Sequence, residues 1–185
     1  ILADSLATKN DIVELFGAPP DKITVIYGGV EERFAPVTDP ARLEAVRRKY
    51  LLGTEPFILG VGTLQPRKNY TRLVQAFAML KANPPAAFHF PLATLKLVIV
   101  GGKGWLYKDI FAEVRRLGLE EAVVFAGFVD DDDLPALYSA ALALAYPSLY
   151  EGFGLPVLEA MACGAPVVTS NVSSLPEVAG DAALT

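Results

Sequence analysis

Two glutamates, Glu151 and Glu159, stand close together in the stretch 144–164, which reads LAYPSLYEGFGLPVLEAMACG. Glu151 opens a turn that contains two glycines, and Glu159 lies about one helical turn inside the segment that starts near Pro156. Proline is well tolerated in the first turn of a helix, and Gly164 suits the left-handed position after a helix end. The stretch therefore predicts a buried strand, a glycine turn and a short helix.

The predicted turn has the chemistry of an anion site. A helix that begins just past the carboxyl end of a parallel strand presents free backbone amides and the positive end of its dipole. Carboxylates only accept hydrogen bonds when ionised, so the partners expected for Glu151 and Glu159 are hydroxyl groups. A phosphate flanked by polyols meets both demands, and a nucleotide sugar is such a molecule. Two such acids alone are usually solvated, but the glycines and flanking strands favour binding.

A basic pair, Arg67-Lys68, follows another apolar run, within the sequence GTLQPRKN that begins at Gly62. Arginine and lysine at a strand end can neutralise the two charges of a diphosphate, and arginine can do so bidentately. A basic pair in a loop is most often a surface pair, but its expected place opposite the glutamate turn favours phosphate binding. We therefore expect neither a metal ion nor a cofactor. The acidic run 130–133 is expected to be solvated at a helix start, and His89 to lie outside the chemistry.

Apolar runs alternate with helical patterns from residue 57 onward. The predicted strands cover residues 57–62, 95–100, 122–126, 141–146 and 166–170, and the intervening helices include 70–81, 110–117, 134–138 and 155–163. Strands that are apolar on both faces are typical of a parallel, doubly wound, Rossmann-like α/β sheet. Ligands of such sheets bind at the carboxyl ends of the strands, where the strand order reverses. Every candidate residue follows a strand.

The first part of the chain has a different pattern. Ser5 can cap a helix that stops at Gly17, and the short apolar runs on either side predict a small β-α-β segment. We expect residues 1–36 to form this segment, 37–56 to be a connector, and 57–185 to be the Rossmann-like domain. The start without Met and the strand-like end suggest a piece of a longer protein, truncated at its C-terminus.

Composition limits the possible functions. The chain has 185 residues and a formal net charge of −5, with no basic face of the kind that nucleic-acid binding requires. No apolar run approaches the roughly 20 residues that span a bilayer. Cys163 is the single cysteine, which rules out an internal disulfide and suits a reducing compartment. We expect a soluble, cytoplasmic protein.

The run EGFGLPVLEAMACG resembles the signature of retaining glycosyltransferases of the two-domain GT-B type, family four, also called glycosyl transferases group 1. The resemblance implies that Glu151 contacts the donor sugar and that Glu159 holds ribose hydroxyls. Backbone amides of the turn would bind the diphosphate, at Gly152, Phe153, Gly154 and Leu155.

The basic loop also resembles that of the family, in which an arginine and a lysine bind the diphosphate and stabilise it as it leaves. The implied catalytic residues are thus Glu151, Arg67 and Lys68. Two further residues of the same loop, Gly62 and Thr63, would line the donor site, and backbone groups at Phe128 and Val129 would meet the base. Many members have arginine where this chain has Thr63, and the family usually has asparagine where it has Gly28.

The resemblance implies transfer of a hexosyl group from a nucleotide-diphosphate sugar, with retention of configuration and without a metal. It favours mannose or glucose as the sugar of the donor and a cell-surface polysaccharide as the product. The acceptor, a sugar or a lipid-linked glycan, would bind to the preceding domain, most of which lies outside this sequence. That half would also make any contact with the inner face of the membrane. The chain alone is expected to bind nucleoside diphosphate with negligible transfer.

Three alternatives remain beside this interpretation. A nicotinamide dinucleotide enzyme is suggested by Gly60-x-Gly62, but the third glycine is missing, Pro66 intrudes, and no acid closes the second strand. A glycosidase would hold its two carboxyls across a cleft, roughly 5 to 9.5 Å apart, whereas both acids here belong to one turn-helix unit. A non-catalytic module that binds a nucleotide sugar without transferring it stays open.

Overall fold

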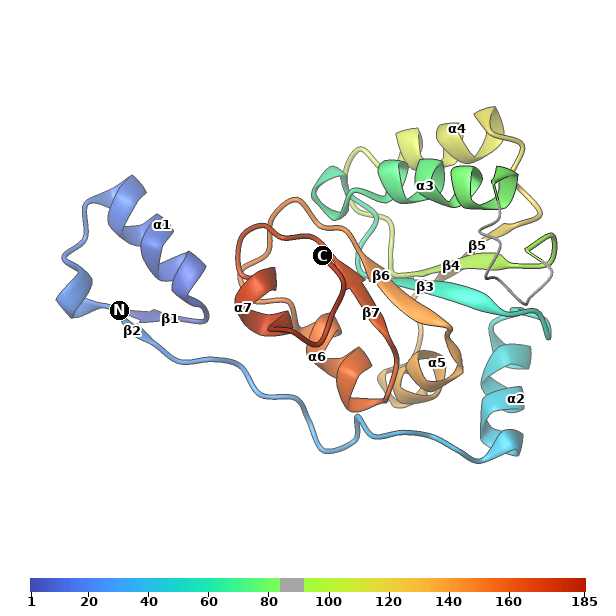
Figure 1. Ribbon diagram of the computed structural model, residues 1–185, viewed down its shortest axis with the longest axis horizontal. Helices are drawn as coiled ribbons and strands as arrows, with labels where there is room; N and C mark the ends of the chain where they lie inside the picture. The colour runs from blue at the N-terminus through green and yellow to red at the C-terminus, as the bar shows by residue number, and fades with distance from the viewer. Residues whose placement is uncertain (84–91) are drawn as a thin grey trace.

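The computed structural model describes residues 1–83 and 92–185 of the chain (Figure 1). His89 lies outside the described residues. The strands are β1 (Leu2–Ala3), β2 (Thr24–Val25), β3 (Phe57–Val61), β4 (Lys96–Val100), β5 (Val123–Gly127), β6 (Ala143–Tyr146) and β7 (Val167–Thr169). The α-helices are α1 (Leu6–Phe16), α2 (Pro40–Lys49), α3 (Tyr70–Ala82), α4 (Lys108–Arg116), α5 (Leu134–Ala140), α6 (Leu155–Ala162) and α7 (Leu175–Ala179). Three short 3-10 helices complete the described elements, η1 (Pro20–Lys22), η2 (Pro66–Lys68) and η3 (Asp131–Asp133).

The main sheet has five strands in the order β5-β4-β3-β6-β7, and every neighbouring pair is parallel. The chain runs outward from β3 to β5, then crosses to β6 on the other side of β3. The strand order therefore reverses between β3 and β6, which is where such sheets bind ligands. The prediction of a doubly wound, Rossmann-like parallel sheet is confirmed, and the predicted strand ends differ from the observed ones by one or two residues.

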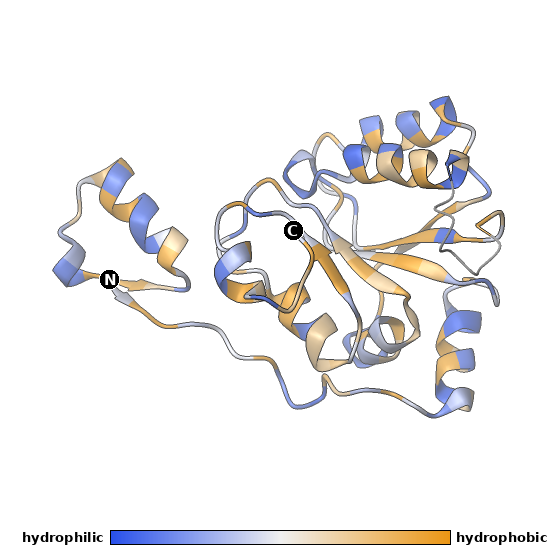
Figure 2. Ribbon diagram, viewed as in Figure 1, coloured by the Kyte–Doolittle hydropathy of each residue, from blue (hydrophilic) through white to orange (hydrophobic). Residues whose placement is uncertain are grey.

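Helices cover both faces of this sheet. Figure 1 shows α3 and α4 on one face and α5 and α6 on the other. The apolar colouring of the strands in Figure 2 agrees with their burial: Leu97, Val98 and Ile99 of β4 have no exposed surface. A strand that is apolar on both faces buries its side chains only when helices cover both faces of the sheet. This sequence therefore forms a three-layer domain.

The first 25 residues form a small unit with its own sheet, in which β1 pairs with β2 in parallel. Ser5 caps α1 by accepting a hydrogen bond from the amide of Thr8, and Gly17 ends the helix with φ 65°, as the sequence predicts. Every residue of α1 is at least partly exposed, including Phe16 at 80%. An extended segment then leads to α2 (Figure 1). Among the helices within residues 1–83 and 92–185, none is both long enough and apolar enough to span a bilayer.

Asp133 corrects one expectation. The acidic run 130–133 was expected to be solvated, but the Asp133 side chain is only 4% exposed. Its carboxylate accepts hydrogen bonds from Arg42 at 2.6 Å, Lys49 at 2.6 Å and Tyr50 at 2.7 Å. Burial alone would raise the pKa of Asp133, but these hydrogen bonds outweigh it and lower the pKa. Asp133 thus fastens α2 to the start of α5.

Replacing Asp133 by asparagine is expected to lower the free energy of unfolding by about 2 to 3 kcal/mol, because it leaves two cations without their shared partner. Both cations are about half exposed, which keeps the cost below that of a fully buried pair. The wild-type contribution is present above the pKa of an unfolded aspartate and is lost as the pH falls through the lowered one. Urea denaturation at pH 7 measures the effect, with the exposed Asp132→Asn as control. Equal stability of the two variants would contradict the prediction.

Candidate functional site

The structure brings the basic loop and the glutamate turn together at the point where the strand order reverses. Lys68 Nζ lies 2.7 Å from Glu151 Oε1, and an Arg67 guanidinium nitrogen lies 2.6 Å from Glu151 Oε2. Lys68 and Glu151 are 8% and 7% exposed. Because η2 follows β3 and the turn follows β6, the adjacent positions of these strands in the sheet put the three side chains in contact. Arg67 also donates to the backbone carbonyl of Tyr150.

Burial and ion pairing both shift the pKa values of Glu151 and Lys68. Burial lowers the pKa of Lys68 below its usual value, and the neighbouring Glu151 carboxylate opposes that effect only in part. Burial would raise the pKa of Glu151, but hydrogen bonds from Lys68 and Arg67 outweigh it, so this pKa is also lowered. The carboxylate therefore stays ionised at neutral pH, and its charge helps to retain a buried cation beside it.

The turn after Glu151 leads directly into α6. Gly154, with φ 113°, is the N-cap of the helix, and a Cβ atom there would lie 2.8 Å from a methyl of Leu175. Only glycine suits both constraints. Pro156 lies in the first turn as predicted and has no N–H, and the amide of Val157 donates to the Gly154 carbonyl at 2.9 Å. An anion at this helix start would therefore meet the amides that precede Pro156, together with the positive end of the helix dipole.

Two serines that the sequence pattern did not single out hold this turn in place. Ser174 is fully buried, and its hydroxyl lies 3.0 Å from the carbonyl oxygen of Glu151 and 2.6 Å from that of Phe153. The amide of Glu151 donates to the side chain of Ser173 at 2.9 Å. Their only sequence signal is their place before a short helix, which gives no hint of a partner more than 20 residues earlier.

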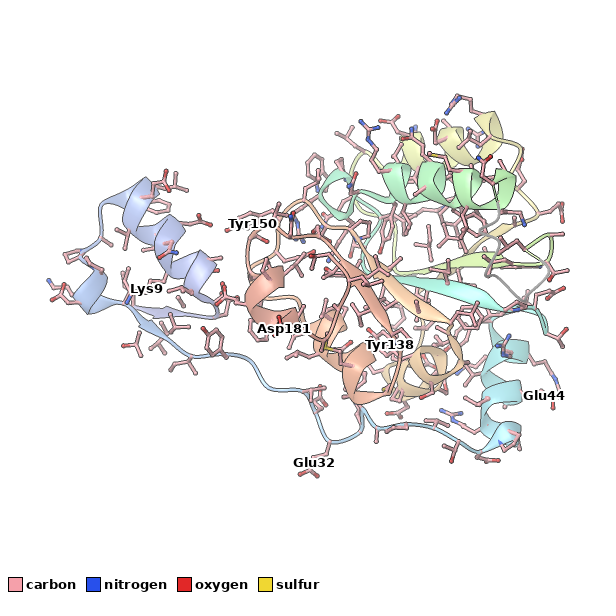
Figure 3. All side chains as sticks on the ribbon, in the orientation of Figure 1. Lys9, Glu32, Glu44, Tyr138, Tyr150 and Asp181 are labelled. Atoms are coloured by element: carbon pink, nitrogen blue, oxygen red, sulfur yellow. The ribbon has the colours of Figure 1, made fainter. Side chains whose placement is uncertain are left out.

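Glu159 lies on α6 and is half-buried. The hydroxyl of Tyr138 on α5 donates to Glu159 Oε2 at 2.7 Å, and Figure 3 shows Tyr138 in the helical layer beside α6. Burial raises the pKa of Glu159, with the Tyr138 hydrogen bond acting in the opposite direction. One carboxylate oxygen is thus fixed by the protein, and the other remains to accept hydrogen bonds.

A cavity of about 200 Å³ opens at the carboxyl ends of β3, β4 and β5. Its lining includes Gly62, Thr63, Phe128, Val129 and Asp131. This volume is below the roughly 300 to 1,000 Å³ of pockets that hold a whole drug-sized ligand, so it suits one ring of a larger ligand. A larger recess of about 420 Å³ lies along α2 and contains none of the predicted site residues.

Gly62 connects this cavity to the lysine. Its φ is 136°, and a Cβ atom there would lie 2.9 Å from Cε of Lys68. A side chain at this position would therefore displace the lysine as well as strain the backbone. The predicted donor residues of the loop thus share one continuous edge with Glu151.

The N-terminal unit packs against the same turn. Tyr150 donates from its hydroxyl to Asp11 at 2.5 Å, and Figure 3 shows Tyr150 on the side of the turn that faces α1. The side chain of Thr8 donates to the carbonyl of Gly152 at 3.2 Å. Gly28 lies so close to Phe153 that a Cβ atom would be 3.1 Å from the ring. An asparagine at position 28 would press on the turn, whereas glycine allows this approach.

Residues 1–83 and 92–185 contain no group of three His, Cys, Asp or Glu side chains that could hold a metal ion. Cys163 is a buried free thiol in the core on the α5 and α6 side of the sheet.

Several known proteins are similar to this chain in sequence. Residues 43–184 match the sequence model of the family described as glycosyl transferases group 1. O-antigen chain mannosyltransferase B of Escherichia coli is 41% identical over 184 residues, which cover 100% of this chain and 46% of that protein. Serotype-specific mannosyltransferase WbdA of Escherichia coli is 36% identical over 189 residues, which cover 97% of this chain and 22% of that protein.

One solved structure is similar along nearly the whole chain. The crystal structure of Anabaena Alr3699/HepE in complex with UDP and glucose matches with a TM-score of 0.79 and 27% identity, covering 95% of this chain and 45% of that one. The chain therefore spans about half, or less, of the length of these three proteins.

Proposed function

The chain belongs to the glycosyl transferases group 1 family, and from that premise we propose that it is the donor-side part of a retaining GT-B glycosyltransferase of family four. It binds a nucleotide-diphosphate sugar and, with the rest of the protein, transfers the hexosyl group to a glycan acceptor. The observation that carries this proposal is the meeting of Lys68, Arg67 and Glu151 beside the start of α6, at the reversal of strand order.

Each part of the donor has a partner of suitable chemistry in this proposal. The diphosphate lies between the basic loop and the first amides of α6, where Lys68, Arg67 and the helix dipole supply positive charge. The ribose hydroxyls bind the free oxygen of Glu159. The base enters the cavity beside Val129 and Thr63. Residues 1–36 belong to the acceptor-side domain, and 37–56 connect it to the donor-side domain.

Glu151 positions the sugar. An ionised carboxylate offers about four lone-pair sites. The contacts with Lys68 and Tyr146 use two sites on Oε1, and the contact with Arg67 uses one on Oε2. The remaining site on Oε2 can accept a hydrogen bond from a sugar hydroxyl. Because the acid is already paired with two cations, we assign it no role as a covalent nucleophile.

The leaving group is stabilised by charge that is in place before the reaction. As the bond between the sugar and the diphosphate breaks, negative charge grows on the diphosphate, and Lys68, Arg67 and α6 stabilise it without reorganising. Such preorganised electrostatic stabilisation is usually the largest catalytic contribution. The acceptor then attacks from the face that the leaving group occupied, which retains the configuration. Side chains and amides supply the positive charge, so we propose that no metal ion takes part.

The names of the relatives support a proposal for the donor and the acceptor. The two Escherichia coli proteins named above are mannosyltransferases, and one is named for the O-antigen chain. We propose a mannosyl donor and a polysaccharide or lipid-linked glycan acceptor, elongated in the cytoplasm. The Anabaena structure contains UDP, so a nucleotide panel must include both UDP and GDP.

The test is a transfer assay with the intact protein, GDP-mannose or UDP-hexose, and a mannose-terminated acceptor, in EDTA. Proton NMR of the product is expected to show the same anomeric configuration as the donor. An inverted product would contradict retention, and dependence on added metal would contradict the metal-free mechanism. Donor binding without transfer would favour the non-catalytic module.

Replacing Glu159 by glutamine is expected to weaken binding of the preferred nucleoside diphosphate by about 10- to 100-fold, since it replaces charge-assisted hydrogen bonds to the ribose with neutral ones. Calorimetric titration measures the change. Glu120→Gln, an exposed glutamate between α4 and β5, is the control and should bind like the wild type. Equal affinity in both variants would remove the ribose assignment.

A further inference from the structure

Tyr146, the last residue of β6, contacts both Lys68 and Glu151, which also contact each other. Its hydroxyl is 2.5 Å from Lys68 Nζ and 3.0 Å from Glu151 Oε1. The Lys68 ammonium also lies 4.6 Å from the centre of the Tyr146 ring. The side chain is 2% exposed, so water does not compete for these contacts.

The direction of each hydrogen bond is fixed by chemistry. An ammonium group has only donors, so the Tyr146 oxygen must accept from Lys68, and its own proton is then free to go to Glu151. Burial, together with the charge of Glu151, raises the pKa of Tyr146, which keeps the phenol protonated at neutral pH. The hydroxyl is thus a bridge between cation and carboxylate.

This bridge determines where the lysine points. A lysine ammonium is a point charge on a flexible stem with three N–H groups. Glu151 and Tyr146 take two of these in the structure. With two N–H groups held, the direction of the third is set as well. A lysine held only by Glu151 would rotate about that single contact.

We propose that Tyr146 is a positioning residue for the transfer reaction, whose hydroxyl holds Lys68 and Glu151 in one geometry and favours the ionised form of both. Its role in catalysis rests on the proposed function above, whereas the contacts themselves do not. The groups that face Lys68 are Glu151 from the turn, Arg67 from η2, Tyr146 from β6 and Tyr70 from α3, whose hydroxyl donates to the Gly62 carbonyl.

The chain contains a matched control. Lys49, Tyr50 and Asp133 form a similar group of lysine, tyrosine and acid. The Tyr50 hydroxyl donates to Asp133 at 2.7 Å, and Lys49 pairs with the same carboxylate oxygen at 2.6 Å, while the Tyr50 oxygen accepts from the Asp130 amide at 3.0 Å. This second group joins α2 to η3. Tyr50→Phe therefore removes a comparable hydrogen bond and serves as a control for lost stability alone.

The experiment compares Tyr146→Phe with Tyr50→Phe and wild type in the intact protein. The first readout is a ¹³C NMR titration of the lysine Cε atoms, with Lys68 assigned by Lys68→Arg. Loss of the Tyr146 hydroxyl removes an acceptor from the ammonium and a donor from the carboxylate. The pKa of Lys68 is therefore expected to fall by about one unit in Tyr146→Phe and to stay unchanged in Tyr50→Phe.

The second readout is hexosyl transfer as a function of pH. Tyr146→Phe is expected to lower kcat about tenfold with little change in KM. Its active pH range should narrow at both ends, because Glu151 protonates at a higher pH and Lys68 deprotonates at a lower one.

An unchanged Lys68 titration in a folded Tyr146→Phe protein would overturn the inference. So would equal changes in Tyr50→Phe, or a Tyr146→Phe protein that does not fold. If the wild type fails to transfer sugar, the proposed function fails, and the titration still decides whether the hydroxyl positions Lys68.

Discussion

Replacing Lys68 by alanine is expected to reduce hexosyl transfer by the intact protein about a thousandfold, with the fold retained. The ammonium is buried, and in the proposed mechanism a positive charge at this place stabilises the departing diphosphate far more than it would in water. Arg67 pairs with Glu151 in the wild type, so we expect the acid to keep this partner and the turn to keep its position in the variant. Steady-state kinetics with the preferred donor measure the effect, and circular dichroism checks the fold.

The control for Lys68→Ala is Lys49→Ala. Lys49 also pairs with a buried carboxylate, but this pair joins α2 to η3 and includes no residue of the turn. The Lys49→Ala variant should be less stable than the wild type, but it should keep wild-type turnover at a temperature below its unfolding transition. A Lys68→Ala protein with wild-type turnover would remove the lysine from the mechanism, and a comparable loss in Lys49→Ala would show that instability alone explains the effect.

Replacing Glu151 by glutamine is expected to lower transfer by about 10²- to 10³-fold and also to destabilise the protein by about 3 kcal/mol. The neutral amide leaves the buried Lys68 ammonium and Arg67 without an anion, which costs more than the loss of an exposed pair. The pKa of Lys68, already lowered by burial, falls further once the opposing charge is gone.

Kinetics and urea denaturation at several pH values test this prediction together. In the wild type, ionised Glu151 stabilises the protein above the pKa of an unfolded glutamate, and that stability is lost as the pH falls through the lowered pKa of the folded state. Glu151→Gln should lack this acid-side loss. Glu151→Asp, which keeps the charge but shortens the side chain, should retain most of the stability and little of the turnover. A Glu151→Gln protein as stable and active as wild type would contradict the account.

The fold could be predicted from local sequence because its signals are local. Apolar runs such as 57–61 and 97–100 are largely buried on both faces, and the glycine after α6 has the positive φ expected of it, 78° at Gly164. The basic loop lies beside the glutamate turn because of the strand order. The alternation of strands and helices predicts a parallel sheet, but it does not determine which strands are neighbours. The contact between Lys68 and Glu151 depended on β3 and β6 being neighbours.

The remaining features depend on partners far away in the chain. The prediction for Asp133 was wrong because its partners on α2 and at the C-cap of this helix lie 83 to 91 residues earlier, and a run of acids gives no sign of them. Tyr146 is simply the end of an apolar strand in the sequence, although its hydroxyl bridges two charges in the structure. Contacts of Asp11 and Thr8 with the turn cross more than 100 residues and likewise leave no local pattern.

The central claim is that a nucleoside diphosphate binds between the basic loop and the start of α6. Calorimetric titration of UDP, GDP, ADP and NAD into this chain, with wild type, Lys68→Ala and Glu159→Gln compared, tests it most directly. The account predicts that one nucleoside diphosphate binds with a stoichiometry of one and that each substitution weakens its binding at least tenfold. Binding of NAD in preference to every nucleoside diphosphate, or binding that both substitutions leave unchanged, would contradict it.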